Sequence, residues 1–204
     1  MVQIIPAILC KTIEELNSKI TRVAPYVKTV QLDMMDGKFV PNATLLPQQL
    51  PALQKNLDYE FHWMYQDPEP YLDMFPKSLH LVNVEILTME KWKRMKKKVK
   101  RLGITINPPT PFESLLPYIN ETNEFLVMTV NPGFSGQKYI VECEEKMHRL
   151  RKLKPKANIE VDGGVDAVTA KRAVAAGANK LVVASALFAR ESIKEAIADI
   201  LSSL

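Results

Sequence analysis

The chain is poor in cysteine and has no long apolar segment. Only two of its 204 residues are cysteines, Cys10 and Cys143, so they cannot form a disulfide framework, and their spacing fits no zinc-binding motif. No stretch approaches the roughly 18 apolar residues that a membrane-spanning helix needs. The apolar run near the N-terminus is short and is interrupted by Pro6, unlike a secretory signal peptide. We therefore expect a cytoplasmic protein without a membrane partner.

The composition excludes several non-globular classes. Hydrophobic residues make up 47% of the chain and charged residues 25%, which is ordinary for a globular protein and argues against disorder, collagen and coiled coil. A chain of this length can bury roughly 70% of its unfolded surface, so its core needs no covalent staples.

The basic excess is small and local. There are 27 Lys and Arg against 23 Asp and Glu, and many of the basic residues lie in KWKRMKKKVKR at 91–101. Within and just after this segment Trp92, Met95, Val99 and Leu102 recur at helical spacing, which favours an amphipathic helix with a solvated lysine face over a nucleic-acid site. No interleaved aromatic residues support stacking on bases, so we expect no nucleic-acid partner.

Short apolar runs alternate with longer amphipathic runs along the whole chain, which predicts repeated strand–helix units. Helices are expected to start near Thr12, Pro47, Pro68, Thr88, Phe112, Lys138, Thr169 and Ser192, with Gly103 and Gly177 among the helix stops. Strands are expected at 3–9, 29–33, 60–64, 79–85, 103–107, 125–130, 158–161 and 180–183.

Eight such units in 204 residues predict an α/β fold, a (β/α)8 TIM barrel that forms one domain over residues 1–204. An open, doubly wound sheet shows the same alternation and is the rival fold. The sequence has no G-x-G-x-x-G after the first strand and no Walker A motif, which weakens the nucleotide-binding versions of that rival.

Chemically useful residues gather where the predicted strands end, the rim that carries function in a (β/α)8 barrel. Asp33 and Asp162 follow the second and seventh strands, which we expect on opposite sides of the barrel, and two such carboxylates can exchange protons with opposite faces of a substrate. His62 ends the third strand and is either a metal ligand beside the two aspartates or a hydrogen-bonded structural histidine. Asp36, before Gly37, is expected to be a turn residue.

Four of the seven glycines lie in the predicted loops after strands six and seven. They are either tight-turn residues or a place where backbone N–H groups approach an anion. Because these loops and the following one lie where barrels commonly bind phosphate, the residue types favour a phosphate site that includes Gly133, Gly136, Gly163, Gly164 and Ser185.

The order of motifs resembles the ribulose-phosphate 3-epimerase family, metal-dependent sugar-phosphate epimerases with a (β/α)8 barrel. PAIL at 6–9 resembles the family's P-S-I-L, and DMMDGKFVPN at 33–42 resembles D-V-M-D-G-x-F-V-P-N. FHWM at 61–64 resembles the H-L-M strand, and NPPTP at 107–111 resembles N-P-x-T-P. VMTVNPGFSGQ at 127–137 and VDGG at 161–164 complete a similarity that covers essentially the whole chain.

The resemblance implies roles for individual residues. Asp33 and Asp162 correspond to the paired acid/base residues, which also bind the metal, and His62 corresponds to one of two histidine ligands. The remaining matched positions correspond to the substrate pocket, with methionines around the reacting carbons and loops around the phosphate: Ala7, Met35, Met64, Met128, Gly133, Phe134, Ser135, Gly136, Gly163, Gly164, Ala184 and Ser185.

Three positions depart from the family pattern. Gln31 stands where the family has its other ligand histidine, Ala7 where it has a substrate-contacting serine, and Ala184 where it usually has glycine. A carboxamide oxygen is a poorer ligand than imidazole for Zn or Fe and suits Mn or Mg better, so Gln31 is a weak or absent metal ligand. We expect lower metal occupancy, a changed metal or no metal, and Gln31→His is expected to raise metal content and epimerase rate.

The implied function is 3-epimerisation of ribulose 5-phosphate to xylulose 5-phosphate in pentose-phosphate metabolism, with a divalent Zn, Fe, Mn or Mg ion that stabilises an enediolate. Two alternatives stay open. One is a divergent epimerase acting on another keto-sugar phosphate, and the other is a catalytically weak protein that binds or senses sugar phosphates. The expected partner is a phosphorylated keto-sugar, and we expect the chain to form a homo-oligomer.

Overall fold

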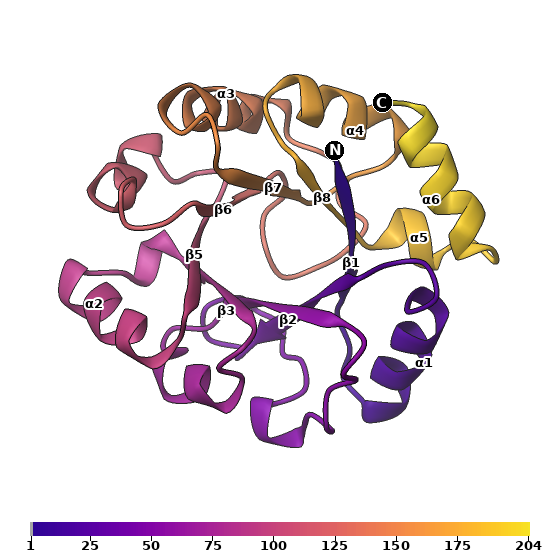
Figure 1. Cartoon of the computed structure of the whole chain (residues 1–204), viewed down its shortest axis with the longest axis horizontal. Helices are drawn as coiled ribbons and strands as arrows, with labels where there is room; N and C mark the ends of the chain where they lie inside the picture. The colour runs from indigo at the N-terminus through magenta and orange to yellow at the C-terminus, as the bar shows by residue number, and fades with distance from the viewer. Residues whose placement is uncertain (1) are drawn as a thin grey trace.

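A computed structural model describes residues 2–204 as a closed barrel of eight parallel strands, each paired with its neighbours and β1 paired with β8 (Figure 1). This confirms the predicted (β/α)8 fold and rules out the open sheet. All eight predicted strands are present, with ends that shift by at most two residues. They are β1 (Gln3–Ile8), β2 (Thr29–Met35), β3 (Asp58–Met64), β4 (Leu79–Asn83), β5 (Arg101–Ile106), β6 (Glu124–Met128), β7 (Asn158–Asp162) and β8 (Lys180–Val183).

Helices surround the barrel, but half of the predicted ones are not α-helices over their expected length. The α-helices are α1 (Ile13–Val23), α2 (Met89–Lys98), α3 (Glu144–Leu153), α4 (Ala167–Ala175), α5 (Ser185–Phe188) and α6 (Ile193–Ser202). The segments expected near Pro47, Pro68 and Phe112 form only 3-10 helices, η1 (Pro47–Gln49), η2 (Glu69–Met74) and η4 (Phe112–Tyr118). Two further 3-10 turns, η3 (Val84–Ile86) and η5 (Val141–Cys143), precede α2 and α3, so the helix expected near Lys138 starts later.

Side-chain caps open four of the six α-helices, while α3 and α5 have none. Thr12, Thr88 and Ser192 each accept a hydrogen bond from the backbone three residues on and open α1, α2 and α6, while Asp166 caps α4. The 3-10 segments begin at Leu46, Pro68 and Pro111, which make no side-chain cap. Gly103, expected to stop a helix, lies inside β5, whereas Gly177 follows α4 with a positive φ of 115° as expected.

The basic segment forms α2, an amphipathic helix as predicted. Trp92 and Met95 are buried against the barrel, while its basic side chains line the other faces. Ion pairs join three of these to acidic residues around η2: Lys91 to Asp67, Arg94 to Glu69 and Lys98 to Asp73. No helix within residues 2–204 is long and apolar enough to cross a bilayer.

Strand register sorts the side chains into an apolar shell outside the barrel and a mixed interior. Alternate residues of each strand face inward, and the pairing places those from every second strand at one level. Gly103 occupies one of the inward-facing positions. Only glycine fits there, because a Cβ would come within 2.8 Å of the side chains of Leu81 and Glu124. From the C-terminal rim downward the levels are Asp33, Asn83, Met128 and Ala184; Ala7, His62, Thr105 and Asp162; Gln31, Leu81, Leu126 and Val182; Ile5, Glu60, Gly103 and Glu160; and Thr29, Leu79, Glu124 and Lys180.

The lower interior of the barrel holds a buried ion cluster. Lys180 Nζ lies 2.8 Å from Glu60 Oε1, 2.7 Å from Glu160 Oε1 and 3.4 Å from Glu124 Oε2. Glu60 and Glu160 are fully buried. Burial raises the pKa of both carboxyl groups, and Lys180 offsets part of that rise. Lys180 therefore supplies the positive charge that compensates the buried carboxyl groups of Glu60 and Glu160.

We predict that Lys180→Met lowers the free energy of unfolding by about 3–5 kcal/mol, because removal of one partner leaves buried carboxylates uncompensated. Chemical denaturation at neutral pH measures this. Lys97→Met, which changes an exposed lysine of α2, is the control and is expected to be neutral. Equal denaturation midpoints for the two variants would show that the cluster does not need its lysine.

Candidate active site

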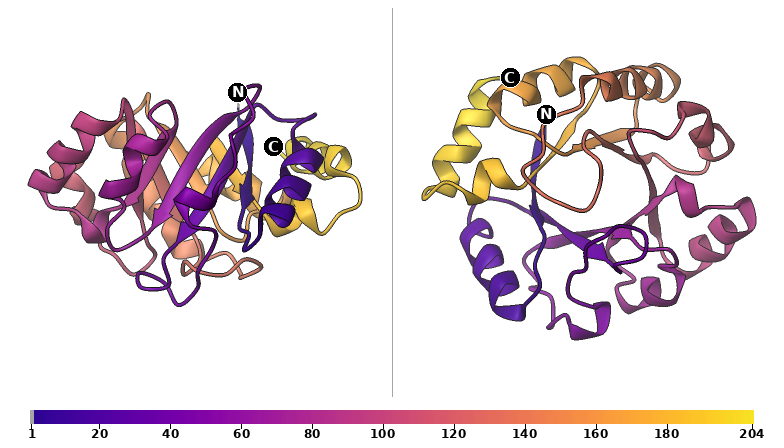
Figure 2. Two further views of the ribbon diagram at one scale, coloured as in Figure 1. Left: turned by 90° about the horizontal axis from the view of Figure 1, so that it is seen from below. Right: turned by 180° about the vertical axis from the view of Figure 1, so that it is seen from behind.

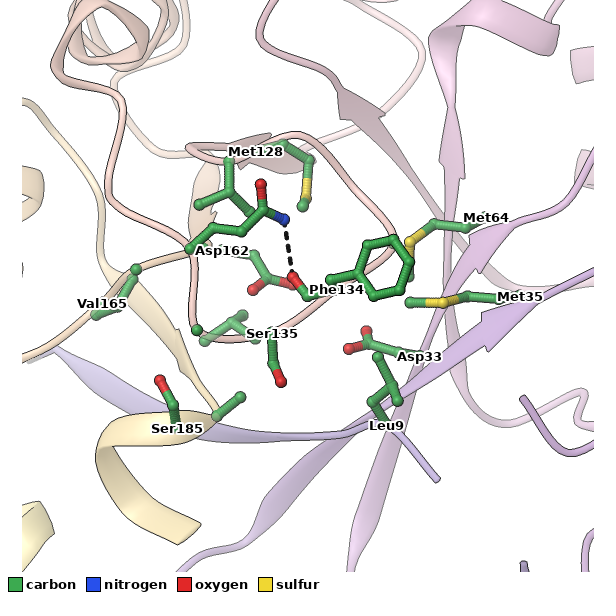
Figure 3. A pocket seen from close by; sticks show the side chains of 18 residues that line it. Leu9, Asp33, Met35, Met64, Met128, Phe134, Ser135, Asp162, Val165 and Ser185 are labelled. Carbon is green, nitrogen blue, oxygen red and sulfur yellow. Dashed lines mark hydrogen bonds between the residues drawn. The ribbon is translucent and has the colours of Figure 1, made fainter. Parts of the chain in front are cut away.

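A pocket opens at the C-terminal rim of the barrel, where the ends of β2 and β3 meet the loops after β1, β6, β7 and β8 (Figure 3). The space between its walls is about 550 Å³, open solvent included. Its apolar wall contains the three methionines of the sequence prediction, and its polar side chains are two carboxylates, two serines and the amide of Gln137. The lining residues are Leu9, Asp33, Met35, Met64, Met128, Val130, Gly133, Phe134, Ser135, Gly136, Gln137, Asp162, Gly163, Gly164, Val165, Val182, Ala184 and Ser185.

The carboxylates of Asp33 and Asp162 enter the pocket from β2 and β7 (Figure 3). The sequence predicted opposite sides of the barrel, but closure through β1 and β8 leaves the two strands only three steps apart. Both side chains are mostly buried, with 11% and 13% exposed. The Nε2 of Gln31 donates to both, at 2.9 Å to Asp33 Oδ1 and 2.8 Å to Asp162 Oδ2. The two acids therefore form one unit.

His62 lies beside this pair on β3 and is fully buried. Its Nδ1 is 3.6 Å from Asp33 Oδ1 and 3.8 Å from Asp162 Oδ2, and neither ring nitrogen has a hydrogen-bond partner. One ligand atom from each of the three residues lies within 4.8 Å of the others. Ligand atoms about 2 Å from a shared ion stand at comparable separations, so this donor set fits a divalent cation.

The environment favours a proton on the acid pair. Burial raises the pKa of Asp162, and the nearby carboxylate of Asp33 raises it further, while His62 and the Gln31 amide lower it; the net pKa is about 7. Because the two acids interact closely, the proton belongs to the pair. At neutral pH the site can therefore hold one acidic and one basic carboxyl group side by side, which proton transfer requires.

The loop between β6 and η5, salmon in Figures 1 and 2, curls across the barrel opening. The Gln137 side chain braces it by donating to the carbonyls of Asn131 and Phe134, at 2.7 and 2.9 Å. Asn42, in the loop after β2, donates to the Gly133 carbonyl at 2.7 Å. Phe134 remains 55% exposed at the tip, over the pocket.

The paired glycines after β7 permit a close approach between two loops. A Cβ on Gly163 would lie 2.5 Å from Val130, and one on Gly164 would lie 2.6 Å from the Tyr139 backbone nitrogen, and both residues have positive φ. The hydroxyl of Thr129 donates to the Gly163 carbonyl. Tight packing therefore requires glycine at these positions, whatever ligand the loops bind.

Most of the predicted site residues line the pocket, but three do not. Ala7, Gln31 and His62 are buried beneath its floor. Asp36 is a turn residue as predicted: it accepts hydrogen bonds from the backbone of Lys38 and Phe39 in its turn, and a third from the backbone of Gln66. His80 bonds to Trp63 and to the Phe75 carbonyl.

Sequence reasoning missed five lining residues. The alternation of inward-facing positions could have identified Val182, between Lys180 and Ala184. The resemblance motifs contained three others, Leu9, Val130 and Gln137, without assigning them to the pocket. The missed residues are Leu9, Val130, Gln137, Val165 and Val182.

The fold and site define a (β/α)8-barrel protein with two carboxylates and a histidine converging under its C-terminal rim. Solved structures share this fold across the whole chain. The 3-hexulose-6-phosphate synthase of Salmonella typhimurium matches with a TM-score of 0.73 at 15% identity, covering 99% of this chain and 98% of its own. KGPDC of Streptococcus mutans matches with a TM-score of 0.74 at 10% identity, covering 100% and 97%.

The chain belongs to the ribulose-phosphate 3-epimerase family, whose family model matches residues 3–188. The ribulose-phosphate 3-epimerase of Schizosaccharomyces pombe is 34% identical over 213 residues, covering 99% of this chain and 93% of the relative. The enzyme of that name from Bacillus subtilis is 32% identical over 216 residues and covers both chains fully. The chain is accordingly an isomerase of the epimerase type, as the sequence motifs predicted.

We predict that Asp162→Asn stabilises the metal-free protein, and more so at pH 8 than at pH 5. The folded pKa of Asp162, about 7, lies above its ordinary 3.8. A raised carboxyl pKa contributes stability that is fully present below pH 3.8 and is lost as pH rises through 7, whereas asparagine has no charge to bury. Thermal denaturation in chelator at the two pH values measures the difference.

Asp58→Asn, at an exposed aspartate at the start of β3, is the matched control and should show no such pH trend. A variant at Asp162 that is less stable than the wild type at pH 8 would mean that the ionised carboxylate is well accommodated in the barrel.

Proposed function

We propose that this protein interconverts ribulose 5-phosphate and xylulose 5-phosphate by inverting the carbon next to the ketone. The observation that carries the proposal is the pair of carboxylates, Asp33 and Asp162, bridged by Gln31 in a pocket at the C-terminal rim of the barrel. The match of the chain to an epimerase family over residues 3–188 supports an enzyme rather than a binding protein.

In the proposed reaction, one of the two aspartates takes a proton from the substrate and the other gives one back. One carboxylate removes the proton from C3, and the electrons of that bond move to give an enediolate across C2 and C3. The other carboxylic acid returns a proton to C3 from the opposite face, so the product differs only in configuration. Because the coupled pair holds a proton near neutral pH, one aspartate can act as the acid while the other acts as the base, and the roles reverse in the other direction.

A divalent cation fits the same groups, and Asp33, His62 and Asp162 would hold it, with the Gln31 oxygen available as a fourth donor. When bound, it supplies positive charge that stabilises the negative charge developing on the substrate oxygens. His62 is well placed for this role because its ring nitrogens are buried and make no hydrogen bonds within the protein.

The side of the pocket formed by the loops after β6, β7 and β8 is the proposed phosphate site. Its backbone comes close to the pocket at Gly136, Gly164 and Ser185, and the serine adds a hydroxyl donor. The N-terminus of α4 is not the anchor, because Asp166 already accepts from the first free N–H groups of this helix. Phosphate binding here depends on loop N–H groups.

We predict that Asp33→Asn and Asp162→Asn each abolish conversion of ribulose 5-phosphate, with a loss of at least about 10²–10⁴-fold, because each carboxyl group serves one face of C3. Turnover is measured with and without added Mn²⁺ or Zn²⁺. Asp58→Asn is the control and should keep full activity. A variant of either pocket aspartate that keeps most of the wild-type rate would rule out the two-carboxylate mechanism.

We predict that ribulose 5-phosphate raises the melting temperature by about 5–10 °C at roughly 100 times its Kd, while ribulose does not. The reason is that loop N–H groups and Ser185 bind the phosphate and not the sugar alone. Differential scanning fluorimetry of the wild type and of Ser185→Ala makes the comparison. Equal shifts of the melting temperature with ribulose 5-phosphate and with ribulose would show that the pocket does not recognise the phosphate group.

A further inference from the structure

Gln31 occupies an unusual position in the barrel interior. It lies in the middle of β2, is fully buried, and its side chain stands one level below Asp162. One nitrogen, Nε2, donates one hydrogen bond to Asp33 and a second to Asp162, which is 131 residues away in the sequence. Within residues 2–204 no other hydrogen bond reaches either carboxylate group.

These two hydrogen bonds do part of what a cation would do. Two carboxylate oxygens within 4.8 Å of each other repel, and a carboxylate can only accept hydrogen bonds. An amide nitrogen that presents one hydrogen to each oxygen reduces the repulsion and fixes the distance between the acids. Hydrogen bonds to ionised groups are stronger than those between neutral groups. Gln31 therefore positions the acids without a metal.

The other end of the amide has no partner. Gln31 Oε1 is buried and makes no hydrogen bond. An N–H group pointing at a cation is repelled by it, whereas a carboxamide oxygen is an acceptable ligand for a hard divalent ion such as Mn²⁺ or Mg²⁺. A half-turn of the amide exchanges its nitrogen and oxygen at the same place. The present orientation and a cation on Asp33 and Asp162 therefore exclude each other.

We propose that Gln31 is a two-state positioning residue. In one state its nitrogen bridges Asp33 and Asp162 in place of a cation, and in the other its amide is turned so that the oxygen binds a hard divalent cation. The proposal rests on the proposed function only in taking these two carboxyl groups as the proton carriers. It follows that cation binding competes with two hydrogen bonds and that the acids stay in position when no cation is bound.

The first test removes the amide in metal-free protein. Gln31→Met keeps a long, unbranched side chain but leaves the two acids without donors. In chelator its melting temperature is expected to fall by about 5–15 °C, the loss of two hydrogen bonds to charged groups. Gln3→Met is the matched control, because Gln3 also faces the barrel interior and makes one hydrogen bond, to Thr29. A fall no larger than that of Gln3→Met would overturn the bridged state.

The second test needs no variant and follows the wild-type amide by NMR. In chelator the Gln31 side-chain NH₂ signals are expected downfield and slow to exchange, because both hydrogens are bonded. Saturating Mg²⁺ is expected to move both signals upfield as the amide turns. Signals that stay in place while calorimetry shows the ion bound would overturn the proposal. The proposal would also be overturned if calorimetry detected no binding of Mg²⁺ at millimolar concentration, because the cation-bound state would then not exist.

The third test compares affinities. Gln31→His offers a ring nitrogen with no bridge to break, so calorimetry with Mn²⁺ is expected to give at least about tenfold tighter binding than the wild type. Equal affinity would show that the bridge does not compete with the ion. None of the three tests uses a substrate, so a protein without epimerase activity could still confirm the proposal, and an active epimerase could still refute it.

Discussion

The parallel register of a closed, eight-stranded barrel decides which side chains meet in its interior. Because side chains alternate along each strand and the register shifts around the barrel, residues from every second strand reach the same level. This constraint brings His62 and Asp162 to one level, places Gln31 directly below, and brings Lys180 to Glu60 and Glu160 further down. The candidate active site and the buried ion cluster are therefore parts of one stack of inward-facing side chains.

The stack carries more negative than positive charge. Four carboxyl groups, those of Asp33, Asp162, Glu60 and Glu160, lie mostly or fully buried in the interior, with Lys180 as the buried cation among them. Such an interior favours protons, a divalent cation or hydrogen-bond donors near the carboxylates. Three features of the site follow from this excess of negative charge. The pKa of Asp162 is raised, Asp33, His62 and Asp162 are spaced as ligands of a cation would be, and the Gln31 amide donates hydrogen bonds to both aspartates.

Much of the fold and the site could be predicted from the sequence. The alternation of strand and helix signals located all eight strands, and the motif residues at their ends line the pocket. Two kinds of feature were predicted wrongly. The segments that follow Leu46, Pro68 and Pro111 form 3-10 rather than α-helices, and none of these three residues makes a side-chain cap. Gly103 was misjudged because the need for a small residue comes from Leu81 and Glu124, on neighbouring strands.

The sequence by itself determined the order of elements, the family and the motif residues at the strand ends, Asp33 and Asp162 among them, because periodicity and short motifs are local properties of a chain. Only the tertiary structure decided how far apart Asp33 and Asp162 lie, that Ala7, Gln31 and His62 lie beneath the pocket, and that Lys180 has carboxylate partners inside the barrel. These facts depend on distances between residues up to 131 positions apart. Such distances are set by barrel closure and register, which no local pattern of residues encodes.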